Sequence, residues 1–359
     1  MSQEKFTSEL AKVLSDRTAR DLFSGAVLIS HSGQTIFEHG YGYANRAWKI
    51  PNTIHTRYRI ASLSKMFTAL AVFQLIEREL LSFATPLLEI MTLPSTKMPS
   101  SVTIQHLLTM TSGIADWFDE SGDWEANWQQ LITTHPIYLF RENKDYLPLF
   151  LNSEPLFPVG QRYMYNGAGY ILLGLVIEKI TGQSYFNYVT SEIFNPFGMQ
   201  QTAFIALDEP ALNVAEGYVK IEQEGKPTSW QRNIYSTTPQ AAADGGATST
   251  LTDMLLFSKA IRAGSMLSTE LAAEFLTPKV KQFEDSFRDY YWHYGYANIF
   301  LVDELRQITR WGHTGEEDGV SCRLFYFPHQ DVDAIILGNQ SWCAGELGWE
   351  IHDLVIGLL

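Results

Sequence analysis

The order of strand-like and helix-like segments constrains the fold of this chain more than any other feature. Apolar runs typical of strands lie near both ends of the 359-residue chain, and helical periodicity fills the middle. The predicted strands are Gly25 to Ser30, Gln34 to Glu38, Tyr294 to Val302, Gln307 to Trp311, Val320 to Phe327 and Asp333 to Leu337. The first two form a hairpin, and we expect it to pair with the late strands in one antiparallel sheet.

Helical patterns complete the predicted architecture. An amphipathic helix with Phe6, Leu10 and Leu14 precedes the hairpin, and an apolar helix up to Leu359 follows the last strand. The middle holds the helical segments Leu63 to Leu81, Ile104 to Thr109, Tyr170 to Thr181, Tyr185 to Phe194 and Thr252 to Ala263. We expect an α+β fold: an antiparallel sheet flanked by terminal helices, with an inserted, mostly α-helical lobe. Residues 1–359 would form one domain, with an α/β lobe of approximately 1–61 and 245–359, a helical lobe of approximately 62–244, and a cleft between them.

The charge balance argues against nucleic acid as a partner. Forty acidic and 26 basic residues give a formal net charge of -14, which repels a phosphate backbone. The N-terminal segment has no signal-peptide pattern, and no apolar run approaches the roughly 20 residues that cross a bilayer. We therefore expect a soluble, cytoplasmic protein that binds neither nucleic acid nor membrane and keeps Cys322 and Cys343 reduced.

The first candidate for chemistry is Ser62-Leu-Ser-Lys65, which directly precedes an apolar helical run. A hydroxyl at a helix N-terminus lies in the field of unpaired N–H groups, which favours negative charge on its oxygen. Lys65 lies one turn further along the same face, where its amine can assist proton transfer from Ser62. A Ser-x-x-Lys arises by chance about once in a chain of this length. The alternative is a capping serine beside a solvated lysine.

Two later segments supply further reactive groups. Tyr165 lies where a Pro/Gly loop passes into an apolar helix, so its hydroxyl can move a proton at a leaving group. Its alternative is a packed aromatic residue with a wet hydroxyl. In Trp311-Gly-His313-Thr-Gly315, the glycine permits close backbone approach, and the N–H of Glu316 can then face an oxyanion. Taken by itself, His313 reads as a structural histidine.

In this order the three segments resemble the motifs of serine β-lactamases, penicillin-binding proteins, D-alanyl-D-alanine carboxypeptidases and related esterases, most closely the class C branch. In that family a Ser-x-x-Lys, a Tyr-x-Asn and a Lys-Thr-Gly or His-Thr-Gly converge on one cleft. Three supporting segments also match in order and spacing: Thr103 to Gly113, Ile193 to Met199 and Asp244 to Asp253. The resemblance covers the chain from about Gly25 to its C-terminus.

This resemblance implies roles for the matching residues. Ser62 would be acylated, Lys65 would assist proton transfer, and Tyr165 would be the general acid/base at the leaving group. His313 would lie where the third motif usually has a cation. The backbone N–H groups of Ser62 and Glu316 would form the oxyanion hole. No metal or organic cofactor is implied, and the partner would be a small-molecule acyl substrate.

The substrate-binding positions depart from the family pattern. The second motif reads Tyr-Asn-Gly, so Gly167 stands where the family has an asparagine that helps hold the acylamide side chain of a penicillin or peptide. Asn166 is the neighbouring candidate for that contact. The resemblance further implies that Thr314 and Gly315 border the substrate. The missing asparagine weakens the case for penicillins and peptides more than the case for catalysis.

A second departure is the acidic run Glu316, Glu317 and Asp318 directly after Gly315. One interpretation is that all three side chains point to solvent, because acidic residues are rarely buried unpaired. The other is that one of them faces the cleft. A like-charge pair about 4 Å apart costs on the order of 4 kcal/mol in a partly shielded site, so a substrate carboxylate would then bind poorly.

We therefore expect a serine hydrolase that forms a covalent acyl-enzyme on neutral or cationic esters or amides, with weak or no β-lactamase activity. One alternative is a true β-lactamase or D,D-peptidase. Another is a penicillin-binding or sensor protein that acylates without turnover.

Overall fold

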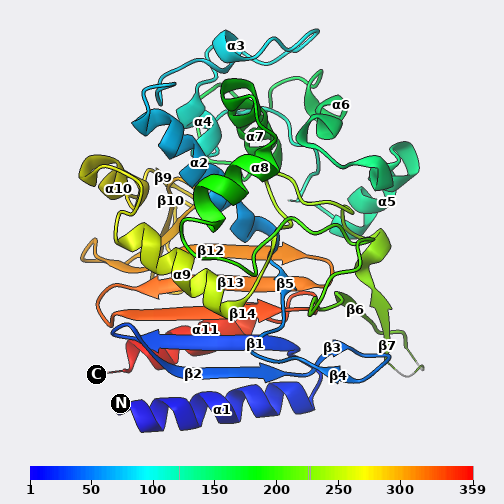
Figure 1. Cartoon of the computed structure of the whole chain (residues 1–359), viewed down its shortest axis with the longest axis vertical. Helices are drawn as coiled ribbons and strands as arrows, with labels where there is room; N and C mark the ends of the chain where they lie inside the picture. Colours follow the sequence, from blue (N-terminus) through cyan, green and yellow to red (C-terminus); the bar gives the residue numbers. More distant parts are fainter. Residues whose placement is uncertain (121, 225, 227, 359) are drawn as a thin grey trace.

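An eight-stranded antiparallel sheet forms the centre of the computed structural model, which describes residues 1–120, 122–224, 226 and 228–358 (Figure 1). Its strand order is β2-β1-β14-β13-β12-β11-β10-β9. The strands are β1 (Gly25–His31), β2 (Gln34–Tyr41), β9 (Val280–Lys281), β10 (Tyr291–Tyr294), β11 (Ile299–Val302), β12 (Ile308–Glu317), β13 (Val320–Phe327) and β14 (Val332–Gly338). Because β1 pairs with β14 along its whole length, the two ends of the chain share one sheet, as predicted.

Eleven α-helices occur in the described part of the chain, and most of them lie between β2 and β9 in the sequence. They are α1 (Gln3–Ala19), α2 (Lys65–Glu77), α3 (Leu87–Ile90), α4 (Ile104–Leu108), α5 (Trp124–Thr134), α6 (Leu147–Phe150), α7 (Gly167–Thr181), α8 (Tyr185–Val189), α9 (Leu251–Arg262), α10 (Thr269–Phe275) and α11 (Gly345–Ile356). Among the described residues, no helix combines the length and apolar character needed to cross a membrane. The predicted α+β fold is confirmed.

The central strands of the sheet are buried on both faces. Along β14, Ile335 and Leu337 belong to the core shared with the central helices, whereas Ala334 and Ile336 belong to the core shared with α1 and α11. Successive side chains of a strand point to opposite faces. The uninterrupted apolar run of β14 is therefore the pattern expected of a strand covered on both sides.

The structure corrects three details of the predicted elements. The predicted strand from Tyr294 to Val302 is two strands, β10 and β11, because a tight turn at 295–298 reverses the chain: Gly295 N–H donates to the Asn298 carbonyl at 2.8 Å. The strand predicted from Gln307 to Trp311 is β12, which continues to Glu317. The last helix ends at Ile356, and Leu359 lies outside the described residues.

The chain also contains short strand pairs that the prediction missed. They are β3 (Tyr43–Asn45) with β4 (Ile50–Pro51), β5 (Tyr58–Arg59) with β8 (Thr248–Ser249), and β6 (Tyr218–Ile221) with β7 (Ser229–Arg232). Strands of two to four residues are too short for an alternating pattern to stand out from a loop. The β5–β8 pair matters most, because β5 leads directly to Ser62.

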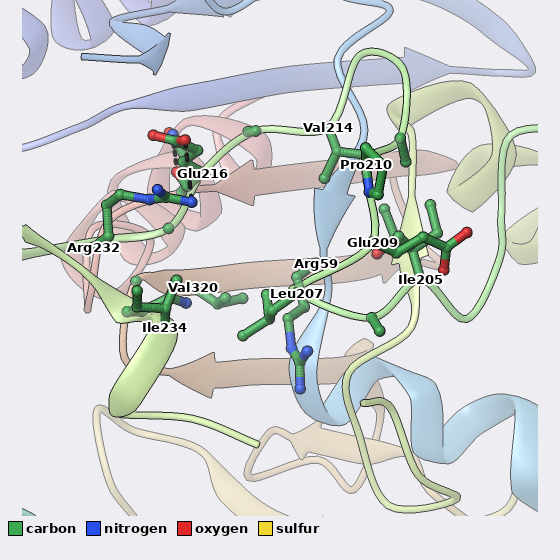
Figure 2. A pocket seen from close by; sticks show the side chains of 18 of the residues that line it. Arg59, Ile205, Leu207, Glu209, Pro210, Val214, Glu216, Arg232, Ile234 and Val320 are labelled. Atoms are coloured by element: carbon green, nitrogen blue, oxygen red, sulfur yellow. Dashed lines mark hydrogen bonds and ion pairs between the residues drawn. The ribbon is translucent and has the colours of Figure 1, made fainter. Parts of the chain in front are cut away.

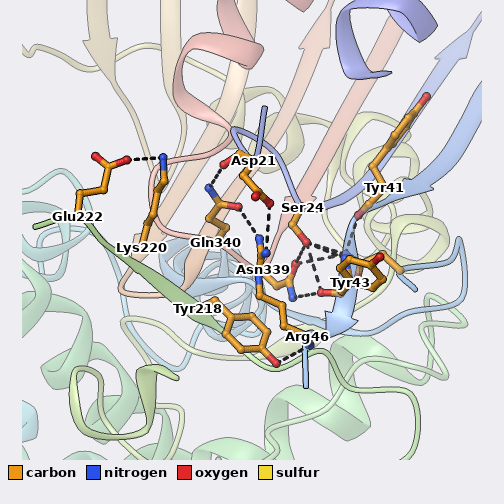
Figure 3. A network of polar contacts seen from close by, with 11 residues as sticks. Asp21, Ser24, Tyr41, Tyr43, Arg46, Tyr218, Lys220, Glu222, Asn339 and Gln340 are labelled. Atoms are coloured by element: carbon orange, nitrogen blue, oxygen red, sulfur yellow. Dashed lines mark hydrogen bonds and ion pairs between the residues drawn. The ribbon is translucent and has the colours of Figure 1, made fainter. Parts of the chain in front are cut away.

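A buried polar network ties distant segments together beside the sheet (Figure 3). Asn339, just beyond β14, accepts a hydrogen bond from the Ser24 hydroxyl at 2.8 Å and donates to the carbonyls of Tyr43 at 3.0 Å and Glu216 at 2.8 Å. Arg46 N–H donates to the Tyr218 hydroxyl at 2.8 Å. Because buried polar groups are costly unless paired, this network fixes the β6–β7 ribbon against the sheet.

Candidate active site

Ser62 lies in a short 3₁₀ turn, Ala61–Ser64, immediately before α2. Ala61 has a φ of 45°, in the left-handed region that non-glycine residues rarely adopt. The turn is held by Ser64, whose hydroxyl donates to the Ala61 carbonyl at 2.8 Å and accepts from Ala247 N–H at 3.0 Å. Such strained turns concentrate at functional sites. The turn leaves Ser62 partly exposed while its neighbours are buried.

Lys65 brings its amine to the Ser62 hydroxyl, as the Ser-x-x-Lys spacing predicts. The side chain is 1% exposed, and Nζ donates to Ser62 Oγ at 3.1 Å and to the Asp244 carbonyl at 2.5 Å. The same Nζ lies 5.0 Å from the centre of the Tyr165 ring. The lysine is therefore a packed, oriented group next to Ser62 and not a solvated one.

Tyr165 also reaches Ser62, because the loop before α7 carries its ring into the same cleft. The Ser62 side chain is near enough to its phenol to lower the pKa of Tyr165, although larger effects oppose this. Burial raises the pKa of Tyr165 well above its usual value, and the negative charges of Glu120 and Asp244 raise it further. The phenol therefore keeps its proton near neutral pH and can donate it.

His313 does not supply a cation, contrary to the role that the resemblance implied. The imidazole is 1% exposed, and burial lowers the pKa of His313 to about 3. Nδ1 lies 2.6 Å from the Thr314 carbonyl oxygen and therefore carries the proton. Nε2 is left to accept from the Tyr294 hydroxyl at 3.2 Å. This neutral histidine packs beneath the cleft, with its ring centre 6.4 Å from that of Tyr165.

Gly315 lets β12 approach the segment that precedes Ser62. A Cβ atom at Gly315 would lie 2.3 Å from the carbonyl oxygen of Ile60, a distance that no side chain tolerates. The backbone around Glu316 is thereby brought close to the Ser62 turn, as an oxyanion hole formed by their N–H groups would require. Thr314 lies opposite Arg323 in the sheet, on the face covered by α11, so its side chain points away from the cleft. Its predicted substrate contact is not supported.

Glu316 and Glu317 of the acidic run lie on opposite faces of the sheet, and each forms an ion pair. Glu316 turns away from Ser62, forms an ion pair with Arg323 and accepts from the Ser321 hydroxyl at 2.9 Å. Glu317 lies on the cleft side and pairs with Arg59, with 2.9 Å between Oε2 and Nε. The carboxylate of Glu317 therefore faces the cleft while paired with Arg59, and that of Glu316 does not.

Asn166 is not available to a substrate. It caps α7: its side-chain oxygen accepts from Gly169 N–H at 2.7 Å, and its amide nitrogen donates to the Ile114 carbonyl at 3.0 Å. The side chain is 4% exposed. We therefore correct its assignment from substrate contact to helix cap.

The space beside Gly167 is filled by residues that the sequence did not reveal. A Cβ atom there would lie 2.7 Å from both Asp244 Oδ2 and Trp117 Nε1, which are hydrogen-bonded to each other at 2.8 Å. Asp116 accepts from the N–H groups of Gly167 at 2.7 Å and Ala168 at 2.8 Å, and burial raises its pKa to about 6. Asp116 and Trp117 carry no local motif, so only the folded loop shows where they lie.

Two cavities flank the segment that leads to Ser62. A narrow one of about 40 Å³ is lined by Ser62 and Lys65, by Glu120, Asp244 and Glu317, and by the aromatic residues Trp117, Phe118, Trp124 and Trp128. A larger one of about 220 Å³ lies beyond Arg59, with Leu207 and Val320 in its wall (Figure 2). Ser62 is not among the described residues that line the larger cavity. The chemistry of the site belongs to the narrow cavity.

A sheet assembled from both ends of the chain, with Ser62, Lys65 and Tyr165 meeting at its helical lobe, defines a β-lactamase-like protein. The Beta-lactamase family model matches residues 10–342, and the chain belongs to this family. It is similar to a penicillin binding protein from Bacillus halodurans, with 35% identity, a TM-score of 0.83, and coverage of 94% of this chain and 98% of that one. A penicillin-binding protein homologue from Pyrococcus abyssi, described as octameric, has 26% identity, a TM-score of 0.81, and coverage of 97% and 76%.

A curated relative gives the same family by sequence. Penicillin-binding protein 4* of Bacillus subtilis (strain 168) is 35% identical over 182 residues, which are 50% of this chain and 38% of that protein. The match therefore spans well under half of the relative's length.

Proposed function

We propose that this protein is a serine hydrolase that forms an acyl-enzyme on neutral or cationic esters or amides and has weak or no β-lactamase activity. The observation that carries the proposal is the convergence on one hydroxyl: Lys65 Nζ lies 3.1 Å from Ser62 Oγ and 5.0 Å from the centre of the Tyr165 ring. A nucleophile placed beside both a basic and an acidic group is the arrangement that acyl transfer needs.

The proposed reaction has two steps. Ser62 Oγ forms a bond to the acyl carbon while its proton passes to the neutral amine of Lys65. Tyr165 gives its phenol proton to the leaving oxygen or nitrogen as that bond breaks, and the resulting tyrosinate takes a proton from the Lys65 ammonium. Water then attacks the acyl-enzyme, and the same groups return the proton to Ser62. The N–H groups of Ser62 and Glu316 would stabilise the oxyanion in both steps.

Two observations favour the substrate range. The Trp117–Asp244 pair occupies the space beside Gly167, where an asparagine of the family would hold an acylamide group. In addition, Lys65 is the only lysine or arginine among the described residues lining the narrow cavity, which also holds Glu120, Asp244 and Glu317. Burial raises the pKa of Glu120 to about 8, so this side chain carries little charge near neutral pH. A substrate carboxylate would still meet the carboxylates of Asp244 and Glu317, and a like-charge pair about 4 Å apart costs on the order of 4 kcal/mol.

A single preparation tests the proposal. We expect hydrolysis of a short-chain nitrophenyl ester at a rate well above that of a chromogenic cephalosporin, and covalent labelling by a fluorophosphonate that Ser62→Ala abolishes. Ser191→Ala is the matched control, because Ser191 is exposed and its hydroxyl donates to the Tyr188 carbonyl at 3.2 Å, and this variant should still be labelled. Efficient cephalosporin turnover with negligible ester hydrolysis would refute the substrate assignment, and undiminished labelling of Ser62→Ala would refute the nucleophile.

A further inference from the structure

The ion pair between Arg59 and Glu317 joins the two segments that carry the proposed oxyanion hole. Arg59 Nε donates to Glu317 Oε2 at 2.9 Å, and the side chains are 7% and 17% exposed. Thr237 donates its hydroxyl to the same carboxylate oxygen at 2.6 Å. A charge-assisted bond between two mostly buried side chains is both strong and geometrically restrictive.

Each member of this ion pair lies close in sequence to one of the two N–H groups of the proposed oxyanion hole. Arg59 lies on β5, three residues before Ser62, and Glu317 directly follows Glu316 at the end of β12. Between them the backbones already touch, since a Cβ atom at Gly315 would lie 2.3 Å from the Ile60 carbonyl oxygen. The ion pair therefore holds β5 against the end of β12 on either side of that backbone contact.

The guanidinium is itself held from the other side. Arg59 Nη2 donates to the Thr238 hydroxyl at 3.3 Å, and a Cβ atom at Gly246 would lie 2.6 Å from Nη2. Gly246 N–H donates to the Ala61 carbonyl at 3.2 Å, and Ile60 N–H donates to the Ala247 carbonyl at 2.8 Å. The Arg59 side chain has little room to move, so its ion pair fixes the position of the Glu317 carboxylate.

We infer that Arg59 and Glu317 are positioning residues, which set the distance between the N–H groups of Ser62 and Glu316 and so align the oxyanion hole. This inference rests on the proposed function, because it needs an acyl-transfer reaction at Ser62. Neither side chain is assigned a contact with the reacting atoms. Displacement of a catalytic donor by about 1 Å can cost about 100-fold in rate, which is the effect that the pair prevents.

The test compares Glu317→Gln, Arg59→Lys and the double variant with the wild type, using a nitrophenyl ester and an arylboronic acid. The boronic acid adds to Ser62 Oγ, and the tetrahedral adduct places an oxygen where the oxyanion develops. We expect each single variant to lower kcat/KM about 10- to 100-fold, mainly through kcat, and to weaken boronate inhibition by a similar factor. The double variant should lose no more than the worse single variant, because the pair acts as a unit.

Asp333→Asn is the matched control for a lost ion pair. Asp333 is 1% exposed and pairs with Arg262, linking α9 to β14 away from Ser62. It should lower the thermal midpoint while leaving kcat and boronate inhibition near wild-type values. If Glu317→Gln and Arg59→Lys behave like Asp333→Asn, the pair is only structural and the inference fails while the proposed function stands. If the wild type neither hydrolyses the ester nor binds the boronate, both fail together.

Discussion

Gly167→Ala isolates the crowded space at the start of α7. At most helix positions alanine stabilises relative to glycine, by up to about 1 kcal/mol. Here the added Cβ would lie 2.7 Å from both Asp244 Oδ2 and Trp117 Nε1, so their 2.8 Å hydrogen bond has to lengthen or break. A hydrogen bond to a charged group contributes about 1.5–3 kcal/mol, and overpacking costs about 1–3 kcal/mol. After subtracting the helix preference, we expect a net loss of about 1.5–5 kcal/mol.

The measurement is the free energy of unfolding in urea, with Gly348→Ala as the matched control. Gly348 lies within α11, and a Cβ atom there would meet its nearest neighbour, Phe325 Cε2, at an ordinary 3.5 Å. That variant should be as stable as the wild type or slightly more stable. If Gly167→Ala leaves the free energy of unfolding unchanged or raises it, the space beside α7 is not filled as described.

Two further outcomes follow from buried titratable groups. Burial lowers the pKa of His313 to about 3 in the folded protein, against about 6.5 in an unfolded chain. As the pH falls below 6.5, the unfolded chain gains a proton that the folded protein does not, so the free energy of unfolding falls by up to about 1.4 kcal/mol per pH unit. Urea unfolding at pH 7 and pH 5 should show about 2 kcal/mol less acid destabilisation in His313→Gln than in the wild type, and equal pH dependence would contradict this. Burial also raises the pKa of the Cys322 thiol, and it raises the pKa of the Cys343 thiol to about 12. A thiol reagent at pH 8 should therefore modify both cysteines only after denaturation. Rapid reaction of the native protein would contradict their burial.

Much of the fold was predictable because the sheet leaves a pattern at both ends of the sequence. The hairpin of β1 and β2 and the strand β13 have strong apolar runs bounded by turns, and both were located. The misjudged strand at Tyr294 failed for a local reason, since Ala297 adopts a left-handed φ of 53° that its identity does not announce. Short pairs such as β5–β8 depend on tertiary contact alone.

The parts of the site that were predictable are those formed by residues close together in the sequence. Ser62 and Lys65 are one turn apart, so their spacing is sufficient to bring them together. The protonation of His313 depends instead on what surrounds it, and the sequence does not contain that information. The same is true of Asp116, whose partner Gly167 is 51 residues away. The cap that Asn166 forms on Gly169 N–H is local, and an asparagine directly before an apolar helix is the sequence signal that could have revealed it.

The pairing of β1 with β14 has a consequence for the way the protein is made. Gly25 pairs with Gly338 and His31 with Val332, so the first strand has no permanent neighbour on that side until more than 300 further residues have been synthesised. Contacts so distant in sequence slow folding and expose unpaired strand edges in the meantime. Because Glu316 comes from the same late segment, the proposed oxyanion hole cannot form until that segment has been synthesised.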